Sequence, residues 1–137
     1  MKKILFVCHG NICRSVMAEY ILKSLDKDNK FYIESKATTK EEIGNDIYPP
    51  VKIVLEKNNI AYDKHKARQI FPNDYYNFDY IYCMDSENLT DLEKILPSNN
   101  KTYLLDESEI EDPWYTRDFD QCFTKIYNAC LNIVDNI

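Results

Sequence analysis

The 137-residue chain lacks long hydrophobic runs and an excess of positive charge. No apolar run approaches the roughly 18 residues that a membrane-spanning helix needs. Only five apolar residues stand between Met1-Lys2-Lys3 and His9, which is too few for the core of a secretory signal peptide. The net charge of −6 argues against nucleic acid and anionic membranes as partners, although an acidic protein can still hold a local positive pocket.

Repeats, low-complexity segments and linkers are also absent. We therefore expect residues 1–137 to form one domain, long enough to bury roughly 65–70% of its unfolded surface. The five cysteines, in a chain without a signal-peptide core, are expected to be free thiols in a reducing compartment. The expected location is therefore cytoplasmic.

Short apolar segments alternate with helical segments along the chain. The expected strands are residues 3–7, 31–35, 79–84 and 101–105, and the expected helices are residues 15–26, 49–58, 86–96 and 119–137. This alternation predicts an α/β fold with a parallel sheet, right-handed crossovers and helices on both faces. The last helix carries a continuous apolar stripe that includes Cys122 and Cys130, and we expect this stripe to be core.

The most informative segment is Cys8-His9-Gly10-Asn11-Ile12-Cys13-Arg14-Ser15, which joins the first expected strand to the first expected helix. A thiolate at Cys8 is a nucleophile that can attack phosphorus, and Arg14 offers a planar fork for two phosphoryl oxygens. Backbone N–H groups of the loop and the helix N-terminus can bind the other oxygens. The same positive surroundings favour the ionised sulfur.

The place of this segment strengthens its interpretation, because cysteine and arginine at this spacing also occur by chance. A loop between the first strand and the first helix lies at the carboxyl end of the strand, where ligands bind in open α/β sheets. In the helix, Met17, Tyr20, Ile21 and Leu25 share one face at three-and-four spacing. Gly10 is one of only two glycines, which predicts a backbone conformation or close approach that a Cβ would obstruct.

A second signature, Ile110-Glu111-Asp112-Pro113-Trp114-Tyr115, lies near the end of the chain. Phosphoryl transfer to a cysteine leaves an oxygen that must be protonated, so a carboxylic acid should face the loop. Pro113 biases Asp112 toward extended geometry and keeps it out of a helix. Trp114 and Tyr115 can form the walls of a slot for a flat substrate ring.

Together these segments resemble the low-molecular-weight protein tyrosine phosphatases over nearly the whole chain. Between the two signatures, other matching segments follow in the right order: Ala67-Arg68-Gln69 after His65, Phe78-Asp79-Tyr80-Ile81, Cys83-Met84-Asp85 and Asn88-Leu89. The resemblance implies a three-layer flavodoxin-like fold with a four-stranded parallel sheet. It also implies hydrolysis of phosphotyrosine and small aryl phosphates without metal or cofactor. Expected partners are phosphotyrosine-containing proteins, with inorganic phosphate or similar oxyanions as inhibitors.

The resemblance further implies a two-step reaction. Cys8 attacks phosphorus while Asp112 protonates the leaving oxygen, and Asp112 then acts as base toward the water that hydrolyses the phosphocysteine. The residues expected to bind phosphate are His9, Gly10, Asn11, Ile12, Cys13, Arg14 and Ser15. The expected hydrogen-bond network that shapes the loop is Asn11, Ser15, Thr39 and His65, with Ser15 donating to Cys8. Cys13 matches a second loop cysteine that can trap an oxidised Cys8 as a reversible disulfide, and the alternative is a small residue packed in the loop.

Several residues depart from the family pattern. Family members commonly have a leucine at the position of His9, a proline at that of Val16 and a small residue at that of Lys36. Tyr48-Pro49-Pro50-Val51-Lys52 stands in place of a Pro-Asp-Pro-Arg stretch. A protonated His9 could favour the thiolate or contact a polar substrate group, or the side chain could simply face solvent. The expected pocket wall is His9, Glu41, Trp114 and Tyr115, so these departures concern substrate specificity.

Four alternative functions are less consistent with the sequence than tyrosine phosphatase activity. A zinc site from Cys8, His9, Cys13 and Cys83 lacks Cys-x-x-Cys spacing and a second cysteine pair. Thioredoxin-coupled arsenate reductases need two further cysteines close together, and Cys83 has no such neighbour. Protein arginine phosphatases have a threonine at the position of Ile12 and lack the aromatic pair after Asp-Pro. A pseudo-phosphatase that only binds phosphate or a partner protein is expected to lack Cys8, Arg14 or Asp112, and all three are present.

Overall fold

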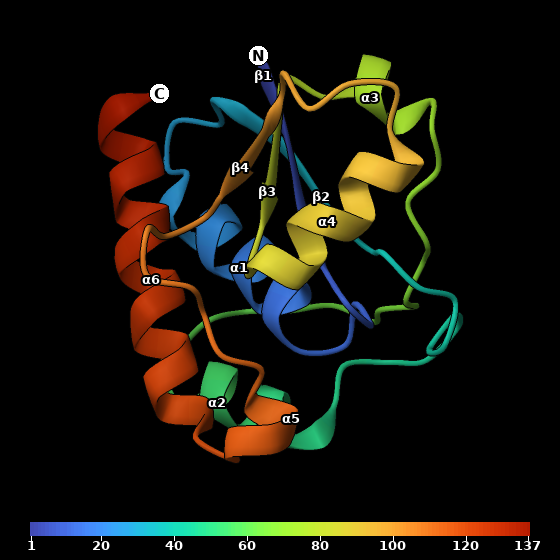
Figure 1. The fold of residues 1–137 in the computed structure, drawn as a ribbon. Coiled ribbons are helices and arrows are strands. Elements are labelled where there is room, and N and C mark those ends of the chain that lie inside the picture. Colours follow the sequence, from blue (N-terminus) through green and yellow to red (C-terminus); the bar gives the residue numbers. More distant parts are fainter.

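Four parallel strands form one sheet in the order β2-β1-β3-β4 (Figure 1). In the computed structural model, which describes residues 1–137, the strands are β1 (Lys2–Cys8), β2 (Phe31–Ala37), β3 (Tyr80–Cys83) and β4 (Thr102–Leu104). β1 lies at the centre and pairs with β2 on one side and β3 on the other. The expected strands and their parallel pairing are confirmed.

Helices cover both faces of the sheet (Figure 1). They are α1 (Arg14–Leu25), α2 (Pro49–Lys57), α3 (Asp74–Asn77), α4 (Ser86–Ile95), α5 (Pro113–Thr116) and α6 (Phe119–Asn136). The four longer helices lie where the alternation predicts them. The sequence pattern does not predict α3 and α5, because four residues are too few to show a helical period. None of the helices combines the length and the apolar character needed to cross a membrane.

The two faces of the sheet pack against cores of unequal size. Alternate residues of β1 point to opposite faces, as the period of a strand requires. Ile4 and Phe6 join the larger core, which includes side chains of α1, α2 and α6. Leu5 and Val7 join the smaller core, which includes side chains of α4. β1 is therefore apolar on both faces, which is why its sequence is a continuous hydrophobic run.

Helix α1 is buried more completely than its sequence suggests. The three-and-four spacing predicts one buried face, but every residue from Arg14 to Leu22 is buried. The reason is its position, since α1 packs against both the sheet and α6. Polar groups in its first turns are consequently shielded from water and must find partners inside the protein.

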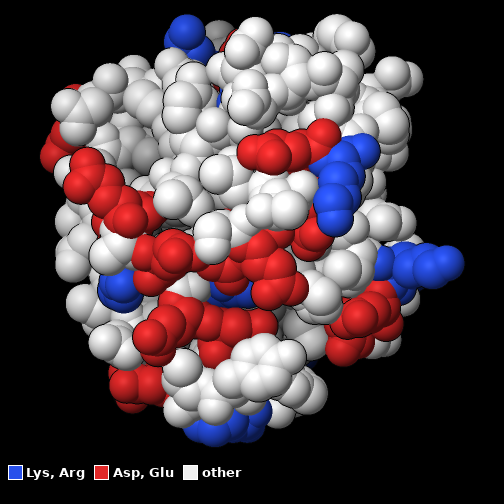
Figure 2. Space-filling view, viewed as in Figure 1, with Lys and Arg blue, Asp and Glu red and all other residues white.

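The polypeptide reaches the expected site at the carboxyl edge of the sheet. β1 ends at Cys8 and α1 begins at Arg14, so the intervening loop lies at this edge. Figure 2 shows a broad band of Asp and Glu side chains across the middle of the molecule, at the level where the strands end, with few Lys and Arg side chains among them. The surroundings of the loop are therefore acidic, in line with the net charge of −6.

Candidate active site

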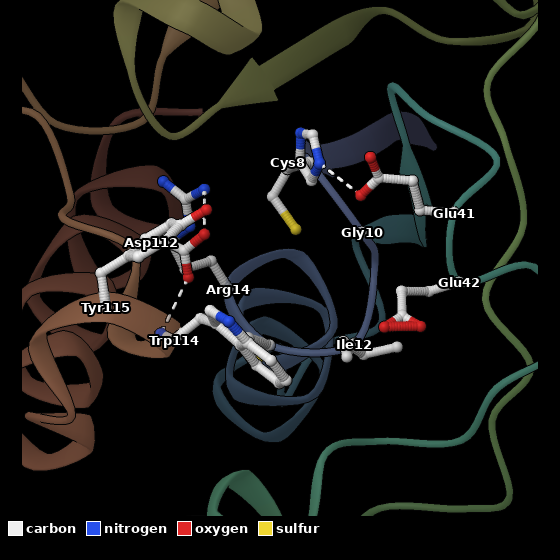
Figure 3. Close-up of a pocket in the computed structure, with 11 residues that line it drawn as sticks. Cys8, Gly10, Ile12, Arg14, Glu41, Glu42, Asp112, Trp114 and Tyr115 are labelled. Atoms are coloured by element: carbon white, nitrogen blue, oxygen red, sulfur yellow. Dashed lines mark hydrogen bonds and ion pairs between the residues drawn. The ribbon is translucent and has the colours of Figure 1, made fainter.

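Residues of both sequence signatures line one cavity of about 200 Å³. Figure 3 shows Arg14 and Asp112 on one side of it and Glu41 and Glu42 on the other, with the Cys8 sulfur pointing between them. The lining residues are Cys8, His9, Gly10, Ile12, Cys13, Arg14, Glu41, Glu42, Asp112, Trp114 and Tyr115. The fold thus brings together the predicted nucleophile, arginine and acid, which are far apart in the sequence.

Cys8 is 3% exposed, and its sulfur is held by Ser15. Cys8 Sγ lies 3.0 Å from Ser15 Oγ, and the Ser15 backbone N–H donates to the same sulfur over 3.4 Å. An ionised sulfur can only accept hydrogen bonds, so in that state the Ser15 hydroxyl donates to it. This is the contact that the family resemblance implies.

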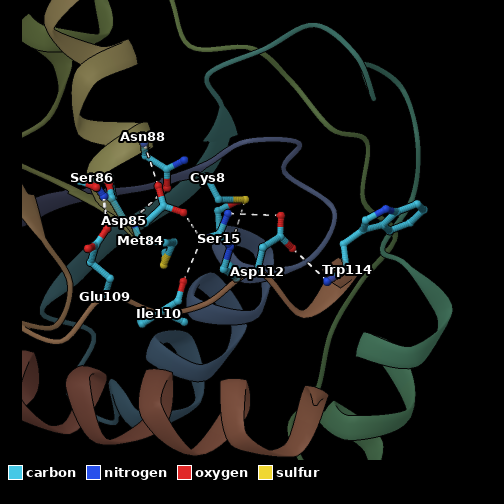
Figure 4. A network of polar contacts seen from close by, with 12 residues as sticks. Cys8, Ser15, Met84, Asp85, Ser86, Asn88, Glu109, Ile110, Asp112 and Trp114 are labelled. Atoms are coloured by element: carbon cyan, nitrogen blue, oxygen red, sulfur yellow. Dashed lines mark hydrogen bonds and ion pairs between the residues drawn. The ribbon is translucent and has the colours of Figure 1, made fainter. Parts of the chain in front are cut away.

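Two hydrogen-bond acceptors and one further carboxylate hold the Arg14 guanidinium. Figure 4 shows the residues that supply them, Asp85, Ile110 and Asp112, in the polar network around Cys8 and Ser15. Nη1 donates to Asp85 Oδ2 over 2.6 Å and to the Ile110 carbonyl over 2.9 Å, and Nη2 lies 3.5 Å from Asp112 Oδ2. Burial alone would lower the pKa of Arg14, but the Cys8 sulfur and the two carboxylates outweigh burial and raise it. Arg14 is therefore a permanent positive charge in a site shielded from water.

One donor of this guanidinium has no partner. Arg14 Nε is buried and makes no hydrogen bond, although the whole side chain is only 2% exposed. A buried N–H without an acceptor is costly, and such groups commonly mark a ligand position. An oxyanion next to Cys8 would supply the missing acceptor.

Asp112 immediately precedes the short helix α5 as its N-cap. Its backbone is extended, with φ −73° and ψ 116°, and Oδ1 accepts the Trp114 backbone N–H over 3.0 Å. Pro113 occupies the first helical position, where its missing N–H is harmless. The expected extended geometry of Asp112 is confirmed, but it comes from its place as the N-cap of a helix that the sequence pattern did not predict.

Asn11 is the centre of the hydrogen bonds behind the loop. It is fully buried with φ 61°, and its Nδ2 donates to Ser15 Oγ over 2.8 Å and to Ser35 Oγ over 2.9 Å. His65 Nε2 lies 2.7 Å from the Asn11 carbonyl oxygen, and the Arg68 backbone N–H donates to Asn11 Oδ1 over 3.2 Å. Every polar atom of the Asn11 side chain is thus satisfied.

Two sequence-based expectations about this loop are met only in part. Thr39 supports the loop at His9 rather than at Asn11: its hydroxyl donates to the His9 carbonyl over 2.9 Å, and the hydroxyl beside Asn11 belongs to Ser35. The positive φ of the loop belongs to Asn11, while Gly10 has none. A Cβ at Gly10 would lie 3.3 Å from Cγ of Glu42, which is a flexible side chain, so the close approach there is mild.

The chain matches one protein family over nearly its whole length. The family described as low molecular weight phosphotyrosine protein phosphatase covers residues 3–137. The protein of that name from Gallus gallus is 38% identical over 145 residues, covering 96% of this chain and 90% of that protein. The chain belongs to this family.

Solved structures agree with this assignment. The low molecular weight protein tyrosine phosphatase from Streptococcus pyogenes has a TM-score of 0.96 and 38% identity, covering 100% of this chain and 93% of that one. A structure described as Drosophila arginine phosphatase has a TM-score of 0.87 and 31% identity, covering 98% and 96%. The chain is thus a low molecular weight protein tyrosine phosphatase, a phosphoric monoester hydrolase.

The outer rim of the phosphatase pocket is polar and exposed. His9 Nε2 lies 2.7 Å from Glu41 Oε2, and their side chains are 39% and 66% exposed. Trp114 packs on Tyr48 with ring centroids 4.9 Å apart, whereas Tyr115 is 82% exposed. His9 therefore pairs with a rim carboxylate, and the aromatic wall of the pocket is chiefly Trp114.

Lys36, another departure from the family pattern, lies away from the pocket. Its Nζ donates to both carboxylate oxygens of the buried Asp74, over 2.8 and 3.0 Å, and lies 4.7 Å above the centre of the Phe71 ring. This ion pair fixes the short helix α3 to the end of β2. The substitution therefore concerns packing.

The four cysteines other than Cys8 are also buried thiols. Burial raises the pKa of Cys83 and of Cys122 to about 12, and it raises the pKa of Cys13 and Cys130 as well. No group of three or more His, Cys, Asp or Glu side chains is placed to hold a metal ion. The zinc interpretation of the loop cysteines therefore has no support.

Three site residues were missed in the sequence. Asp85, which the sequence singles out only as part of a matching segment, binds Arg14 and also accepts the Asn88 backbone N–H at the start of α4. Ser35, which bonds to Asn11, and Glu42, which lines the cavity, belong to no recognisable sequence motif. Asp85 and Ser35 lie at or near the carboxyl ends of strands that flank β1, and this position was the available signal.

Proposed function

We propose that the enzyme hydrolyses phosphotyrosine in proteins, and small aryl phosphates, through a phosphocysteine on Cys8. The observation that carries the proposal is the buried Arg14 with its unpartnered Nε, in one cavity with Cys8 and Asp112. Phosphate oxygens bound by this guanidinium and by the loop N–H groups would bring phosphorus to the sulfur. These donors are fixed before the substrate arrives, so they favour the charge distribution of the transition state.

In the first step, the Cys8 thiolate attacks phosphorus and the bond to the tyrosine oxygen breaks. Asp112 gives its proton to that oxygen, which leaves as the phenol. In the second step, Asp112 takes a proton from a water molecule as the water oxygen attacks phosphorus, and the sulfur–phosphorus bond breaks to release inorganic phosphate and the Cys8 thiolate. The Ser15 hydroxyl, 3.0 Å from the sulfur, would stabilise Cys8 whenever it carries negative charge.

The walls of the cavity favour an aromatic phosphate ester. Ile12 and Trp114 provide apolar surface beside the loop, and Trp114 is supported by Tyr48. A phenyl ring is flat enough to lie between such walls and long enough to carry phosphate to the base of the cavity. Phosphotyrosine-containing proteins are accordingly the proposed substrates, with inorganic phosphate and similar oxyanions as inhibitors.

Phosphoarginine is the second candidate substrate. Glu41 and Glu42 line the cavity opposite Arg14 and would face the positive guanidinium of such a substrate. The related Drosophila structure described as an arginine phosphatase shows that this activity occurs on the same fold. Ile12 and the aromatic side chains favour phosphotyrosine over this alternative.

The test is phosphate release from matched phosphotyrosine, phosphoserine and phosphoarginine peptides, with chelator and thiol reductant present. Selective hydrolysis of phosphotyrosine is the expected result. Preference for phosphoarginine would retain Cys8 and Arg14 but reject the aromatic slot. If the reduced enzyme hydrolyses none of the three peptides, the proposal is rejected.

The cytoplasm is the compartment that we propose for this enzyme. A nucleophilic cysteine must stay reduced to attack phosphorus, and all five cysteines are free thiols.

A further inference from the structure

Glu19 is a buried carboxylate that the proposed reaction does not use. It lies on the second turn of α1 and is 8% exposed. Buried carboxylates are rare unless they are paired or hydrogen-bonded. Glu19 has two partners: Lys23 Nζ donates to Oε2 over 2.6 Å, and the Ser35 hydroxyl donates to Oε1 over 2.5 Å.

A continuous series of hydrogen bonds connects Glu19 with the nucleophile. From Ser35 the series continues to Asn11 Nδ2 over 2.9 Å, from Nδ2 to Ser15 Oγ over 2.8 Å, and from Ser15 Oγ to Cys8 Sγ over 3.0 Å. Asn11, Ser15 and Ser35 are each at most 1% exposed. Water therefore does not compete for these bonds, and the direction of each hydrogen matters.

The two ends of the series determine which way the hydrogens point. A carboxylate and a thiolate can only accept, so Ser35 must donate to Glu19 and Ser15 must donate to Cys8. Each hydroxyl then has only lone pairs left for Asn11. The Asn11 amide group has two hydrogens and gives one to each hydroxyl. Donors and acceptors match throughout, and the Arg68 backbone N–H on Asn11 Oδ1 keeps the amide from flipping.

We propose that Glu19 is a positioning residue for Cys8, which acts through Ser35 and Asn11 to hold the Ser15 hydroxyl hydrogen on the sulfur. This role rests on the proposed function of Cys8. If the side chain at position 19 donated a hydrogen bond to Ser35 instead of accepting one, the Ser35 hydroxyl would turn its own hydrogen toward Asn11. Asn11 would then lose its acceptor, and the Ser15 hydroxyl would no longer be directed to the sulfur alone.

Other ionisable groups surround Glu19 and have to be considered. The ionisable groups that line the two surface cavities beside it are Tyr20, Lys23, Asp26, Tyr32, Glu34, Asp46, Lys64, His65, Lys66 and Arg68. Of these, only Lys23 bonds to Glu19, and Arg68 is paired with Glu34 over 2.6 Å. Lys23 therefore decides how an amide at position 19 would orient.

Glu19→Gln tests the proposal because an amide has one accepting and one donating end. The Lys23 ammonium can only donate, so it attracts the amide oxygen and turns the NH₂ group toward Ser35. The readout is the rate of Cys8 alkylation by iodoacetamide as a function of pH, with the modified cysteine identified by mass spectrometry. We expect the rate at acidic pH to fall about tenfold, the effect of losing about one charge-assisted hydrogen bond to the thiolate.

Two control variants separate this effect from general damage. Lys23→Met alone leaves Glu19 to accept from Ser35, so its alkylation profile should match that of the original enzyme. Glu19→Gln combined with Lys23→Met frees the amide to turn its oxygen to Ser35. The rate of Cys8 alkylation at acidic pH should then regain at least about half of what Glu19→Gln alone loses. A merely structural role for Glu19 would make the double variant no better than Glu19→Gln.

Thermal unfolding confirms that each variant is folded before it is alkylated. If Glu19→Gln does not fold, Ser35→Ala removes the same acceptor from Asn11 and should show the same tenfold loss. An unchanged profile in the folded variant, or no recovery in the double variant, would overturn the proposal. Because alkylation needs no turnover, a failure of the proposed phosphatase reaction would show separately, in the peptide assay.

Discussion

The phosphate loop has two sides that are built differently. Behind the loop, Asn11, Ser15 and Ser35 are buried and fully hydrogen-bonded. On the rim, His9 and Glu41 form a pair that is open to solvent. Loss of a buried partner leaves a desolvated group unsatisfied, whereas an exposed ion pair contributes roughly 0–1 kcal/mol. The inner side should therefore control the chemistry, and the rim should adjust which substrates enter.

The largest effect should come from Cys8→Ser, on the inner side. A serine hydroxyl is a far weaker nucleophile than a thiolate at neutral pH, so turnover should fall by about four orders of magnitude or more. Arg14 and the loop N–H groups remain, so binding of phosphate or vanadate, measured by calorimetry, should persist. Turnover comparable to that of the original enzyme would refute Cys8 as the nucleophile.

Asp112→Asn should have the next largest effect, and it should depend on the leaving group. The amide keeps the Trp114 contact but cannot give a proton, so phosphotyrosine should react about 10²–10⁴-fold more slowly. An aryl phosphate with a strongly acidic phenol needs little protonation and should slow much less. Equal slowing of both substrates would remove Asp112 as the general acid.

Asp85→Asn should lower kcat/KM about tenfold, through loss of one charge-assisted hydrogen bond to Arg14. The guanidinium would keep the Ile110 carbonyl but lose its strongest anchor. Glu93→Gln, which removes an exposed carboxylate from helix α4, the helix that Asp85 caps, is the matched control and should change little. If both variants behave alike, Asp85 does not orient Arg14.

How far the site could be predicted differs between residues for physical reasons. Cys8, Arg14 and Asp112 carry chemistry that few other residues can supply, and each stands in a short local motif, so the sequence was enough to predict that they meet in one cavity. The strands and long helices were predictable from hydrophobic periodicity. The short helices α3 and α5 were not, because four residues are too few for an apolar stripe, and their contacts are specific polar ones: the Lys36–Asp74 ion pair at α3 and the Asp112 cap at α5.

The network behind the loop shows the limit most clearly. Thr39 and Ser35 are both hydroxyl residues a few positions apart, and only the pairing of β1 with β2 decides which one reaches Asn11. Phe6 lies opposite Ser35 in this register, so Ser35 is placed beside the end of β1. Glu42 and Asp85 likewise reach the site through tertiary contacts. No local pattern encodes such contacts.

The redox behaviour of Cys13 offers a pH-dependent test of the inner side of the phosphate loop. Burial raises the pKa of Cys13, so its thiolate fraction is small near neutral pH and rises as the pH rises. Peroxide first converts Cys8 to a sulfenic acid, which the Cys13 thiolate then attacks. The rate of forming the Cys8–Cys13 disulfide should therefore rise about tenfold per pH unit from about pH 6 to pH 8. Mass spectrometry should find more sulfinic acid on Cys8 at the lower pH.

Cys13→Ser is the control for this prediction, because it removes the resolving thiol without adding bulk. In that variant the sulfinic product should form at every pH, and thiol reductant should restore no activity. Overoxidation of the original enzyme that does not vary with pH would contradict a role for Cys13.

The smallest effect should come from the rim. Glu41→Gln removes the charge of the exposed pair with His9 but leaves the buried hydrogen bonds intact. Hydrolysis of a small aryl phosphate, which occupies only the base of the cavity, should change less than about threefold, in line with the energy of an exposed ion pair. Phosphotyrosine peptides with different flanking charges extend past the rim, so their relative kcat/KM values should shift more than that. If Glu41→Gln instead slowed the small substrate as strongly as Asp85→Asn does, the rim would take part in the chemistry, and the division between the two sides of the loop would fail.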